Sequence, residues 1–101
     1  MRTSPKEERA RQMNSSTTPR FRQMFAALPV EVQTRARKAY RLWKENPRHP
    51  SLHFKKVGKV WSSRVDDNFR VLAKVTENTA YWFWIGPHVE YERLISQHRK
   101  G

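Results

Sequence analysis

Two side chains that can transfer protons, His88 and Tyr91, follow directly after the most apolar segment of the sequence. Residues 81–85 are Tyr-Trp-Phe-Trp-Ile, an uncharged run that is typical of a strand buried on both faces. Gly86-Pro87 ends that strand, and proline is favoured in the first turn of a new helix. A spacing of three places His88 and Tyr91 on one side of this helix. The pattern predicts proton chemistry where a rigid strand meets a helix.

Basic side chains occupy one face of the strands that precede this segment. The alternation of a strand places Arg64 with Ser62 and opposite Trp61. On the next strand, three residues share the second face, and these are Arg70, Leu72 and Lys74. One face of the sheet therefore suits burial beneath helices, whereas the other carries arginine and lysine in place of aliphatic residues.

The proton-transferring and aromatic residues also have structural interpretations. His88 can act simply as a hydrogen-bonding residue at the start of a helix, and the Tyr91 ring can pack beneath the sheet. Three tryptophans can stack on nucleotide bases or pack in the core, and these are Trp61, Trp82 and Trp84. Both interpretations stay open for each residue.

The arginines have structural alternatives as well. Arg64 can bind a phosphate or pair with Asp66, two residues on and on the same side of the pleat. Arg70 can bind a phosphate or pair with Glu90 or Glu92.

Two helices are expected ahead of the sheet. Thr17 or Thr18 can cap a helix that begins at Pro19. The second helix, about 30–45, carries an apolar stripe and a basic face that includes Arg41 and Lys44. That basic face is either a solvated surface or a ridge that follows phosphates.

From residue 52 the hydrophobic period changes to two. Four strands are expected, at about 52–57, 60–65, 69–75 and 79–85, separated by short turns. Connections this short make neighbouring strands antiparallel. The sequence therefore predicts an α+β fold, with an N-terminal helical hairpin packed on a four-stranded antiparallel meander sheet and a short C-terminal helix over about 88–97. The expected packing residues of that helix are Val89, Leu94 and Ile95.

Size and charge limit the class of protein. The chain has 101 residues, and we expect a disordered or weakly ordered tail at 1–18 and a single domain at 19–101. Lys plus Arg number 21 against nine acids, a net charge of +12 that favours an anionic partner such as nucleic acid. The chain has no cysteine and no long apolar run, so we expect a cytoplasmic protein that does not enter a membrane.

Five short motifs, in this order and spacing, resemble the RelE/ParE superfamily of bacterial type II toxin–antitoxin toxins. They are Phe-Ala-Ala-Leu-Pro at 25–29, Asn-Pro-Arg-His-Pro-Ser-Leu at 46–52, Trp-Ser-Ser-Arg-Val at 61–65, Phe-Arg-Val-Leu at 69–72 and Trp-Ile-Gly-Pro-His-Val-Glu-Tyr at 84–91. The resemblance covers residues 19–97. It implies a cognate antitoxin that wraps the toxin, and either messenger RNA on the ribosome or DNA gyrase as the target. Many members have a strand ahead of the first helix, and none is expected here.

The RNA-cleaving branch implied by the resemblance uses basic sheet residues and a His or Tyr near the start of the last helix. The matching positions are His88, Arg64, Arg70, Tyr91 and Lys55 or Lys56. Histidine can exchange protons near neutral pH, and arginine gives two parallel donors to phosphate. The alternation places Lys55, and not Lys56, on the outward face.

We therefore predict an endoribonuclease that cleaves mRNA, with His88 as the main acid–base group and Arg64 and Arg70 on the phosphate. Tyr91 is expected to assist. Further RNA or phosphate contacts are expected at Lys55, Lys56, Lys74, Arg41 and Lys44. No cofactor and no metal site are expected, because no cluster of acids lies on the strands.

Two other functions fit the same sequence. The first is a ParE-like gyrase inhibitor without enzymatic activity, because the shared fold does not choose between the branches. The second is a basic nucleic-acid-binding module, for which electrostatic attraction is sufficient.

Overall fold

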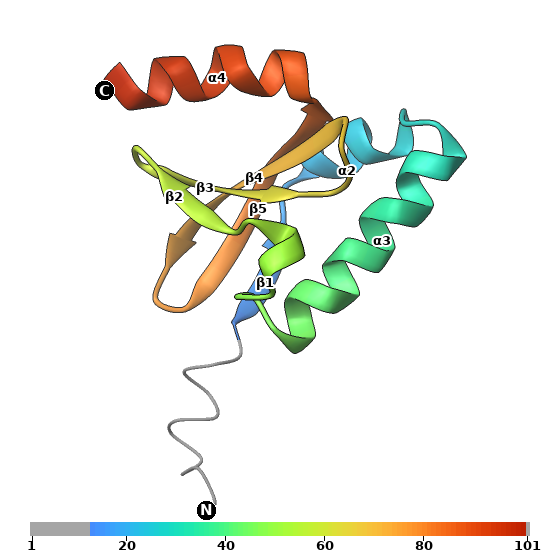
Figure 1. Ribbon diagram of the computed structural model, residues 1–101, viewed down its shortest axis with the longest axis horizontal. Coiled ribbons are helices and arrows are strands. Elements are labelled where there is room, and N and C mark those ends of the chain that lie inside the picture. Colours follow the sequence, from blue (N-terminus) through green and yellow to red (C-terminus); the bar gives the residue numbers. More distant parts are fainter. Residues whose placement is uncertain (1–12, 101) are drawn as a thin grey trace, which may run out of the picture.

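A computed structural model describes the backbone of residues 13–100 and the side chains of residues 13–97. The elements are β1 (Asn14–Thr17), α2 (Pro19–Ala26), α3 (Val30–Glu45), the 3-10 helix η1 (Pro50–Leu52), β2 (Lys55–Val57), β3 (Val60–Arg64), β4 (Phe69–Thr76), β5 (Thr79–Pro87) and α4 (His88–Lys100) (Figure 1). No helix in this part of the chain is long and apolar enough to cross a membrane.

The sheet has five strands in the order β1-β5-β4-β3-β2. Strands β2 to β5 are antiparallel neighbours, as predicted, whereas β1 pairs with β5 in parallel. The prediction of a four-stranded, purely antiparallel sheet was therefore wrong, as was the expectation of no strand before the first helix. Residues 14–17 are Asn-Ser-Ser-Thr, whose pairing depends on backbone hydrogen bonds and gives no hydrophobic signal. Residues 1–12 of the expected tail lie outside the described residues.

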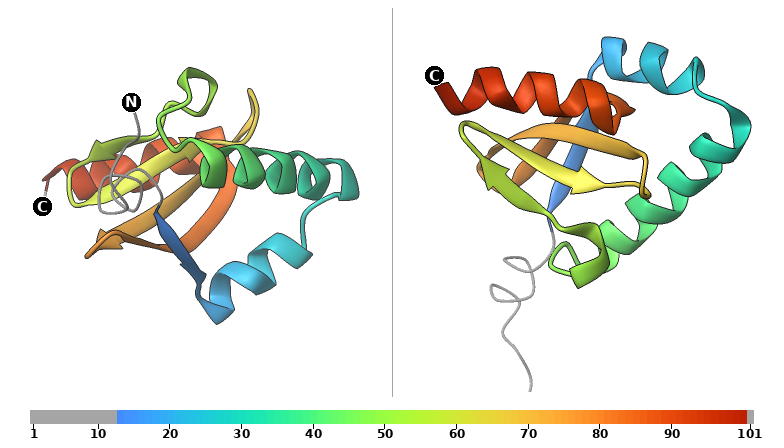
Figure 2. Two further views of the ribbon diagram at one scale, coloured as in Figure 1. Left: turned by 90° about the horizontal axis from the view of Figure 1, so that it is seen from below. Right: turned by 45° about the horizontal axis from the view of Figure 1, so that its top comes forward.

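The helical hairpin α2–α3 begins as predicted. Thr18 is the N-cap of α2, and its Oγ1 accepts a hydrogen bond from the Phe21 amide at 3.0 Å. Pro19 occupies the first helical position. The hairpin packs against one side of the sheet, and α4 lies against the other (Figures 1 and 2).

Each side of the sheet has its own hydrophobic cluster. On the α2–α3 side, the Trp43 ring meets Trp82 and Phe54 edge-on, with centroids 5.1 and 5.7 Å apart. On the α4 side, six buried residues form the cluster, and these are Val57, Val60, Leu72, Trp84, Tyr91 and Ile95. The sheet face expected to stay open around the arginines is thus partly covered by α4.

A β-bulge in β5 explains how the two clusters share one strand. Leu72 is opposite Trp84 while the adjacent Ala73 is opposite Trp82, which leaves Phe83 as the extra residue. As a result, Trp82 packs on the α2–α3 side and Trp84 on the α4 side, although they are two residues apart. Both tryptophans are core residues.

Candidate active site

A small polar hollow lies where β2, β3 and β4 meet the first turns of α4. Its volume is about 170 Å³. Ten residues line it, and these are His53, Lys55, Ser62, Ser63, Arg64, Arg70, His88, Tyr91, Glu92 and Ile95. The structure therefore brings together five residues that the sequence singled out: Lys55, Arg64, Arg70, His88 and Tyr91.

His88 is the first residue of α4 and is held from three directions. Its backbone N–H donates to the Asn68 carbonyl at 2.7 Å, which ties the helix start to the β3–β4 turn. Its Nε2 lies 3.1 Å from Glu92 Oε1, one helical turn along. Its ring lies beside that of Tyr91, with centroids 5.8 Å apart. The imidazole stays 44% exposed, so it is oriented and still open to a ligand.

Tyr91 packs in the core and keeps a polar contact at the hollow. Its side chain belongs to the α4 cluster, and the residue is only 5% exposed. Its hydroxyl donates to Ser62 Oγ at 3.1 Å. A ring this buried has no free face for a nucleotide base, so only the hydroxyl is placed for chemistry.

Arg64 and Arg70 lie directly opposite each other on β3 and β4. Arg64 pairs with Asp67, and not with Asp66 as the sequence suggested. Arg70 Nη1 donates to the backbone carbonyls of Asp66 at 2.6 Å and Phe69 at 3.0 Å, and not to Glu90 or Glu92. Burial and, next, the positive charge of Arg64 lower the pKa of Arg70. The two guanidinium groups together concentrate positive charge at one place, where an anionic group such as a phosphate can bind.

Lys55 completes the cationic lining. It is exposed and lies opposite Ser62 on β3, on the side of the sheet that faces Tyr91. Lys56 lies opposite Trp61, whose ring contacts Phe54 on the other side of the sheet.

The remaining cations predicted to bind RNA lie outside the hollow. Lys56 and Lys74 are exposed strand residues. Arg41 lines another groove of about 680 Å³ beside α3, together with Arg35 and Lys38, and this groove shares Arg64 with the hollow. Lys44 Nζ donates to the Met13 carbonyl at 3.1 Å. Contacts of these four residues with RNA stay a prediction.

Five lining residues were not predicted as site residues, and these are His53, Ser62, Ser63, Glu92 and Ile95. Glu92 follows His88 by four positions on a helix, a spacing that could have identified it as a partner of the imidazole. Ser62 was placed on the face of Arg64 but given no role. His53 has a positive φ of 47° after η1, a turn geometry without a recognisable sequence signal. Within the described part of the chain, no group of three or more His, Cys, Asp or Glu residues is arranged to hold a metal ion.

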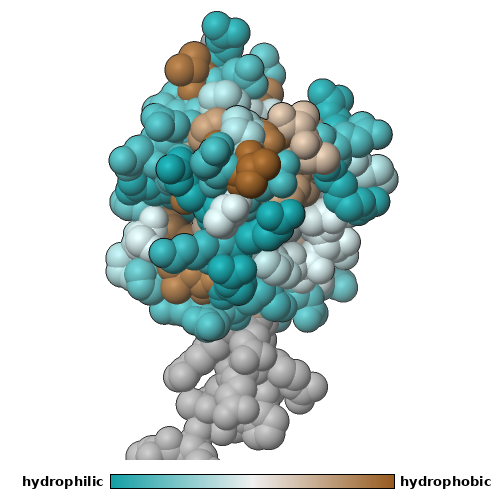
Figure 3. Space-filling model, turned by 90° about the vertical axis from the view of Figure 1, so that its right-hand side faces the viewer, coloured by the Kyte–Doolittle hydropathy of each residue, from teal (hydrophilic) through white to brown (hydrophobic). Residues whose placement is uncertain are grey.

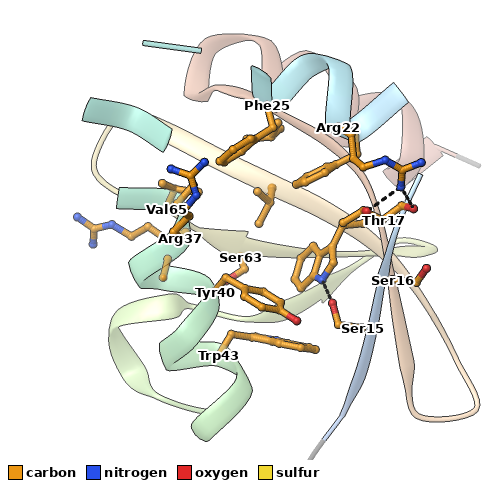
Figure 4. A pocket seen from close by; sticks show the side chains of 17 residues that line it. Ser15, Ser16, Thr17, Arg22, Phe25, Arg37, Tyr40, Trp43, Ser63 and Val65 are labelled. Atoms are coloured by element: carbon orange, nitrogen blue, oxygen red, sulfur yellow. Dashed lines mark hydrogen bonds between the residues drawn. The ribbon is translucent and has the colours of Figure 1, made fainter. Parts of the chain in front are cut away.

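A larger cavity lies between the helical hairpin, β1 and the sheet. It has a volume of about 610 Å³ and is lined mainly by aromatic and aliphatic side chains (Figure 4). At its rim, Arg22 Nη1 donates to the Thr17 carbonyl and hydroxyl at 2.9 and 3.0 Å, and the Arg37 guanidinium lies 5.0 Å from the centre of the Phe25 ring. Among residues 13–97, neither a histidine nor an acid lines this cavity. Although larger, it lacks the histidine and the carboxylate that the described residues bring to the polar hollow, which is therefore the candidate active site.

No protein-family model matches the sequence, and no curated protein matches it. Several solved structures do share its fold. RelE in the RelB–RelE antitoxin–toxin complex from Methanococcus jannaschii aligns with a TM-score of 0.62 and 12% identity, over 78% of this chain and 96% of that chain. YafQ from E. coli aligns with a TM-score of 0.60 and 11% identity, over 79% of this chain and 98% of that chain. A mutant of the E. coli toxin RelE in the free state aligns with a TM-score of 0.61 and 12% identity, over 87% of this chain and 94% of that chain. The resemblance to RelE-type toxins inferred from the motifs is confirmed at the level of the fold.

Proposed function

We propose that this chain, which has the fold of RelE, is the toxin of a toxin–antitoxin pair and acts by cleaving messenger RNA without a metal ion. The observation that supports this function is the meeting of His88, Arg64, Arg70, Lys55 and the Tyr91 hydroxyl around one hollow. A fold alone does not choose a function, so the proposal depends on these side chains.

The proposed reaction is an internal transfer at phosphorus. The ribose 2′-oxygen loses its proton and attacks the adjacent phosphorus, and the bond from phosphorus to the 5′-oxygen breaks. The departing oxygen takes a proton, so the products are a 2′,3′-cyclic phosphate and a 5′-hydroxyl. His88 is the main acid–base group, and Glu92 holds its ring in position at 3.1 Å. His88 accepts the proton of the 2′-oxygen, the departing 5′-oxygen takes a proton from water, and His88 then returns its proton to the solvent. The protons therefore balance, and the reaction needs neither an oxidant nor a second substrate.

The cations of the hollow stabilise the charge that develops on phosphorus. Arg64 and Arg70 stand opposite each other, so a phosphate between them can accept hydrogen bonds from two strands. Lys55 adds a third positive charge from β2. The hydrogen bond from the Tyr91 hydroxyl to Ser62 Oγ holds the bottom of the hollow in place beneath these cations.

The proposed partners follow from charge and from the structural neighbours. RelE occurs with RelB in the complexes from M. jannaschii and from Pyrococcus horikoshii. We extend this to the present chain as a cognate antitoxin, and a net charge of +12 suits an acidic one. Messenger RNA in the cytoplasm, bound at the ribosome, is the proposed target.

Induction of the chain in bacterial cells, followed by sequencing of RNA 5′ ends, tests this function. We expect growth arrest and new 5′-hydroxyl ends, both lost with His88→Ala. Purified His88→Ala should cleave RNA about 10²–10⁴-fold more slowly in the presence of a chelator, as expected for loss of a general acid or base. Val89→Ala, at an exposed neighbouring position, serves as the control.

Full cleavage by His88→Ala would remove the assignment of that residue. Growth arrest with intact RNA and impaired DNA supercoiling would instead support the gyrase-inhibitor function. Salt-sensitive RNA binding without toxicity would support a simple nucleic-acid-binding module.

A further inference from the structure

The β3–β4 turn, residues 65–68, holds two acids that are used very differently. Asp66 Oδ1 accepts the backbone N–H groups of Asn68 and Phe69 at 2.8 and 2.9 Å, a side-chain cap that shapes the turn. Its Oδ2 lies 3.3 Å from Arg35 Nη1 on α3. Asp66 is thus engaged inside the fold, with its side chain only 19% exposed.

Asp67 has its carboxylate on the guanidinium of Arg64, three residues earlier. Its side chain is 84% exposed, whereas that of Arg64 is 33% exposed. The acid therefore approaches the wall of the candidate active site from the solvent side, with little surface of its own buried. The turn does not need this contact to keep its shape, because the Asp66 carboxylate already caps it.

The position of Arg64 explains why an anion is held there. Arg64 and Arg70 are directly opposite on adjacent strands, an arrangement in which like charges repel. Arg70 is compensated by the carbonyls of Asp66 and Phe69. For Arg64 the compensation is the Asp67 carboxylate, which presents oxygens to a guanidinium as a phosphate does.

We propose that Asp67 is an internal stand-in for phosphate, which occupies Arg64 in the free protein and is displaced when an RNA phosphate binds. Exposed ion pairs are weak, so a phosphate that also reaches Arg70 and Lys55 can replace the carboxylate. The displaced Asp67 side chain can return to solvent without losing packing. This inference rests on the proposed RNA-cleaving function and adds a positioning residue that tunes affinity for the phosphate.

The test is the affinity of the full chain for a labelled 2′-O-methyl RNA oligonucleotide, which lacks the attacking hydroxyl and cannot be cleaved. Asp67→Asn should bind about two- to fivefold more tightly, the range expected when a competing exposed ion pair is removed. Glu77→Gln is the matched control, since it makes the same change in net charge at an exposed position in the β4–β5 turn. That turn is separated from the β3–β4 turn by the eight residues of β4.

The origin of the gain is tested in the background of Arg64→Ala. There, Asp67→Asn should give no gain beyond that of Glu77→Gln, because no guanidinium is left to release. Equal affinities of Asp67→Asn and Glu77→Gln in the otherwise native chain would overturn the proposal, as would a gain that persists without Arg64.

The same binding assay separates this inference from the proposed function. Because the probe is not cleaved, an Arg64-dependent gain can be observed even if the chain proves inactive on RNA, and the stand-in role of Asp67 then survives the loss of the nuclease. Cleavage that depends on His88, together with no effect of Asp67→Asn, would retain the nuclease and reject the stand-in.

Discussion

At the scale of single residues, the contact between His88 and Glu92 is the most direct support for proton chemistry. An imidazole at the first position of a helix has no preceding helical turn to pack against, so few contacts constrain its ring. Here a carboxylate lies 3.1 Å from Nε2, and the ring of Tyr91 lies alongside. The imidazole is therefore oriented before any substrate arrives, which is the arrangement that general acid–base catalysis requires.

Glu92→Gln tests this orientation. Glutamine keeps the length and an acceptor oxygen but removes the charge, so we expect RNA cleavage to fall on the order of 10-fold while affinity changes little. In the His88→Ala background the same change should have no further effect, because the ring that Glu92 positions is absent. The measurement is the cleavage rate and the RNA affinity of the native chain, the two single variants and the double variant.

Glu90→Gln is the control for that experiment. It lies on the same turn, is exposed and makes the same charge change, but it does not line the hollow. If Glu92→Gln and Glu90→Gln behave alike, the carboxylate contact has no part in the reaction.

The meeting of the candidate site residues was predictable from the sequence where local geometry decides their position. Helical spacing joined His88 to Tyr91, and strand alternation joined Arg64 to Arg70. Alternation gives the face of a strand but not the distance along it. Lys74 shares the face of Arg70 yet lies four residues further on, about 13 Å at 3.3 Å per residue. The pairing of Arg64 with Asp67 depends on the conformation of the turn, which no residue pattern in this segment specifies.

At the scale of elements, the junction between β5 and α4 positions the imidazole. β5 ends at Pro87 and α4 begins at His88, with no loop between them. Gly86 lies immediately before the junction and is packed against the indole of Trp84. A Cβ at position 86 would approach Trp84 Cζ2 to 2.6 Å and Cη2 to 2.9 Å, closer than van der Waals contact allows. The absence of a side chain there leaves room for the Trp84 indole against the end of β5.

Gly86→Ala should therefore destabilise the protein by about 1–3 kcal/mol, the usual cost of overpacking a core. The added methyl group forces the Trp84 ring to move within the cluster that contains Tyr91, so cleavage should fall as well. Urea unfolding measures the first effect and RNA cleavage the second.

Shortening the neighbouring ring provides the control. Trp84→Phe replaces the indole with a shorter ring, which lacks the Cζ2 and Cη2 atoms that the new methyl group would meet. In that background the further cost of Gly86→Ala should be clearly smaller than in the native chain. Equal costs in both backgrounds would mean that the contact with Trp84 is not the cause.

The elements that the sequence missed are those without a hydrophobic period. β1 consists of polar residues that pair with β5 through the backbone, with Trp82 Nε1 donating to Ser15 Oγ at 3.0 Å. The last helix was predicted, but its packing residues only in part. Ile95 is buried, whereas Val89, which was expected to pack, is 67% exposed. A short helix with few apolar residues leaves its rotation about its own axis undetermined, and the sheet fixes it through Tyr91 and Ile95.

At the scale of the whole molecule, the helices place an apolar cavity on one side of the sheet and a polar hollow on the other. The α2–α3 hairpin encloses the large apolar cavity on one side of the sheet, and α4 frames the polar hollow on the other. The outer surface around α2 and α3 is mostly hydrophilic and is interrupted by small apolar patches (Figure 3). Fold class and strand order within the meander were predictable because short connections leave few alternatives, but the fifth strand and the two separate clusters depend on contacts distant in sequence.

The net charge of +12 makes salt dependence the measurement that belongs to this scale. Binding to single-stranded RNA releases counterions, so the logarithm of affinity falls linearly with the logarithm of salt concentration, by about 0.7 for each phosphate neutralised. Substituting Lys55, Arg64 or Arg70 with alanine should each reduce that slope by about 0.7, because all three line the hollow. The exposed Lys59 in the β2–β3 turn, which does not line the hollow, supplies the control substitution.

Arg41→Ala and Lys44→Ala test whether RNA extends along α3. Reduced slopes with unchanged cleavage of a short oligonucleotide would place a second stretch of RNA there. Slopes equal to that of Lys59→Ala would confine the RNA to the hollow. If the three substitutions in the hollow leave the slope as it is, the phosphate does not bind where the arginines meet, because a neutralised phosphate cannot be lost without changing the number of counterions released.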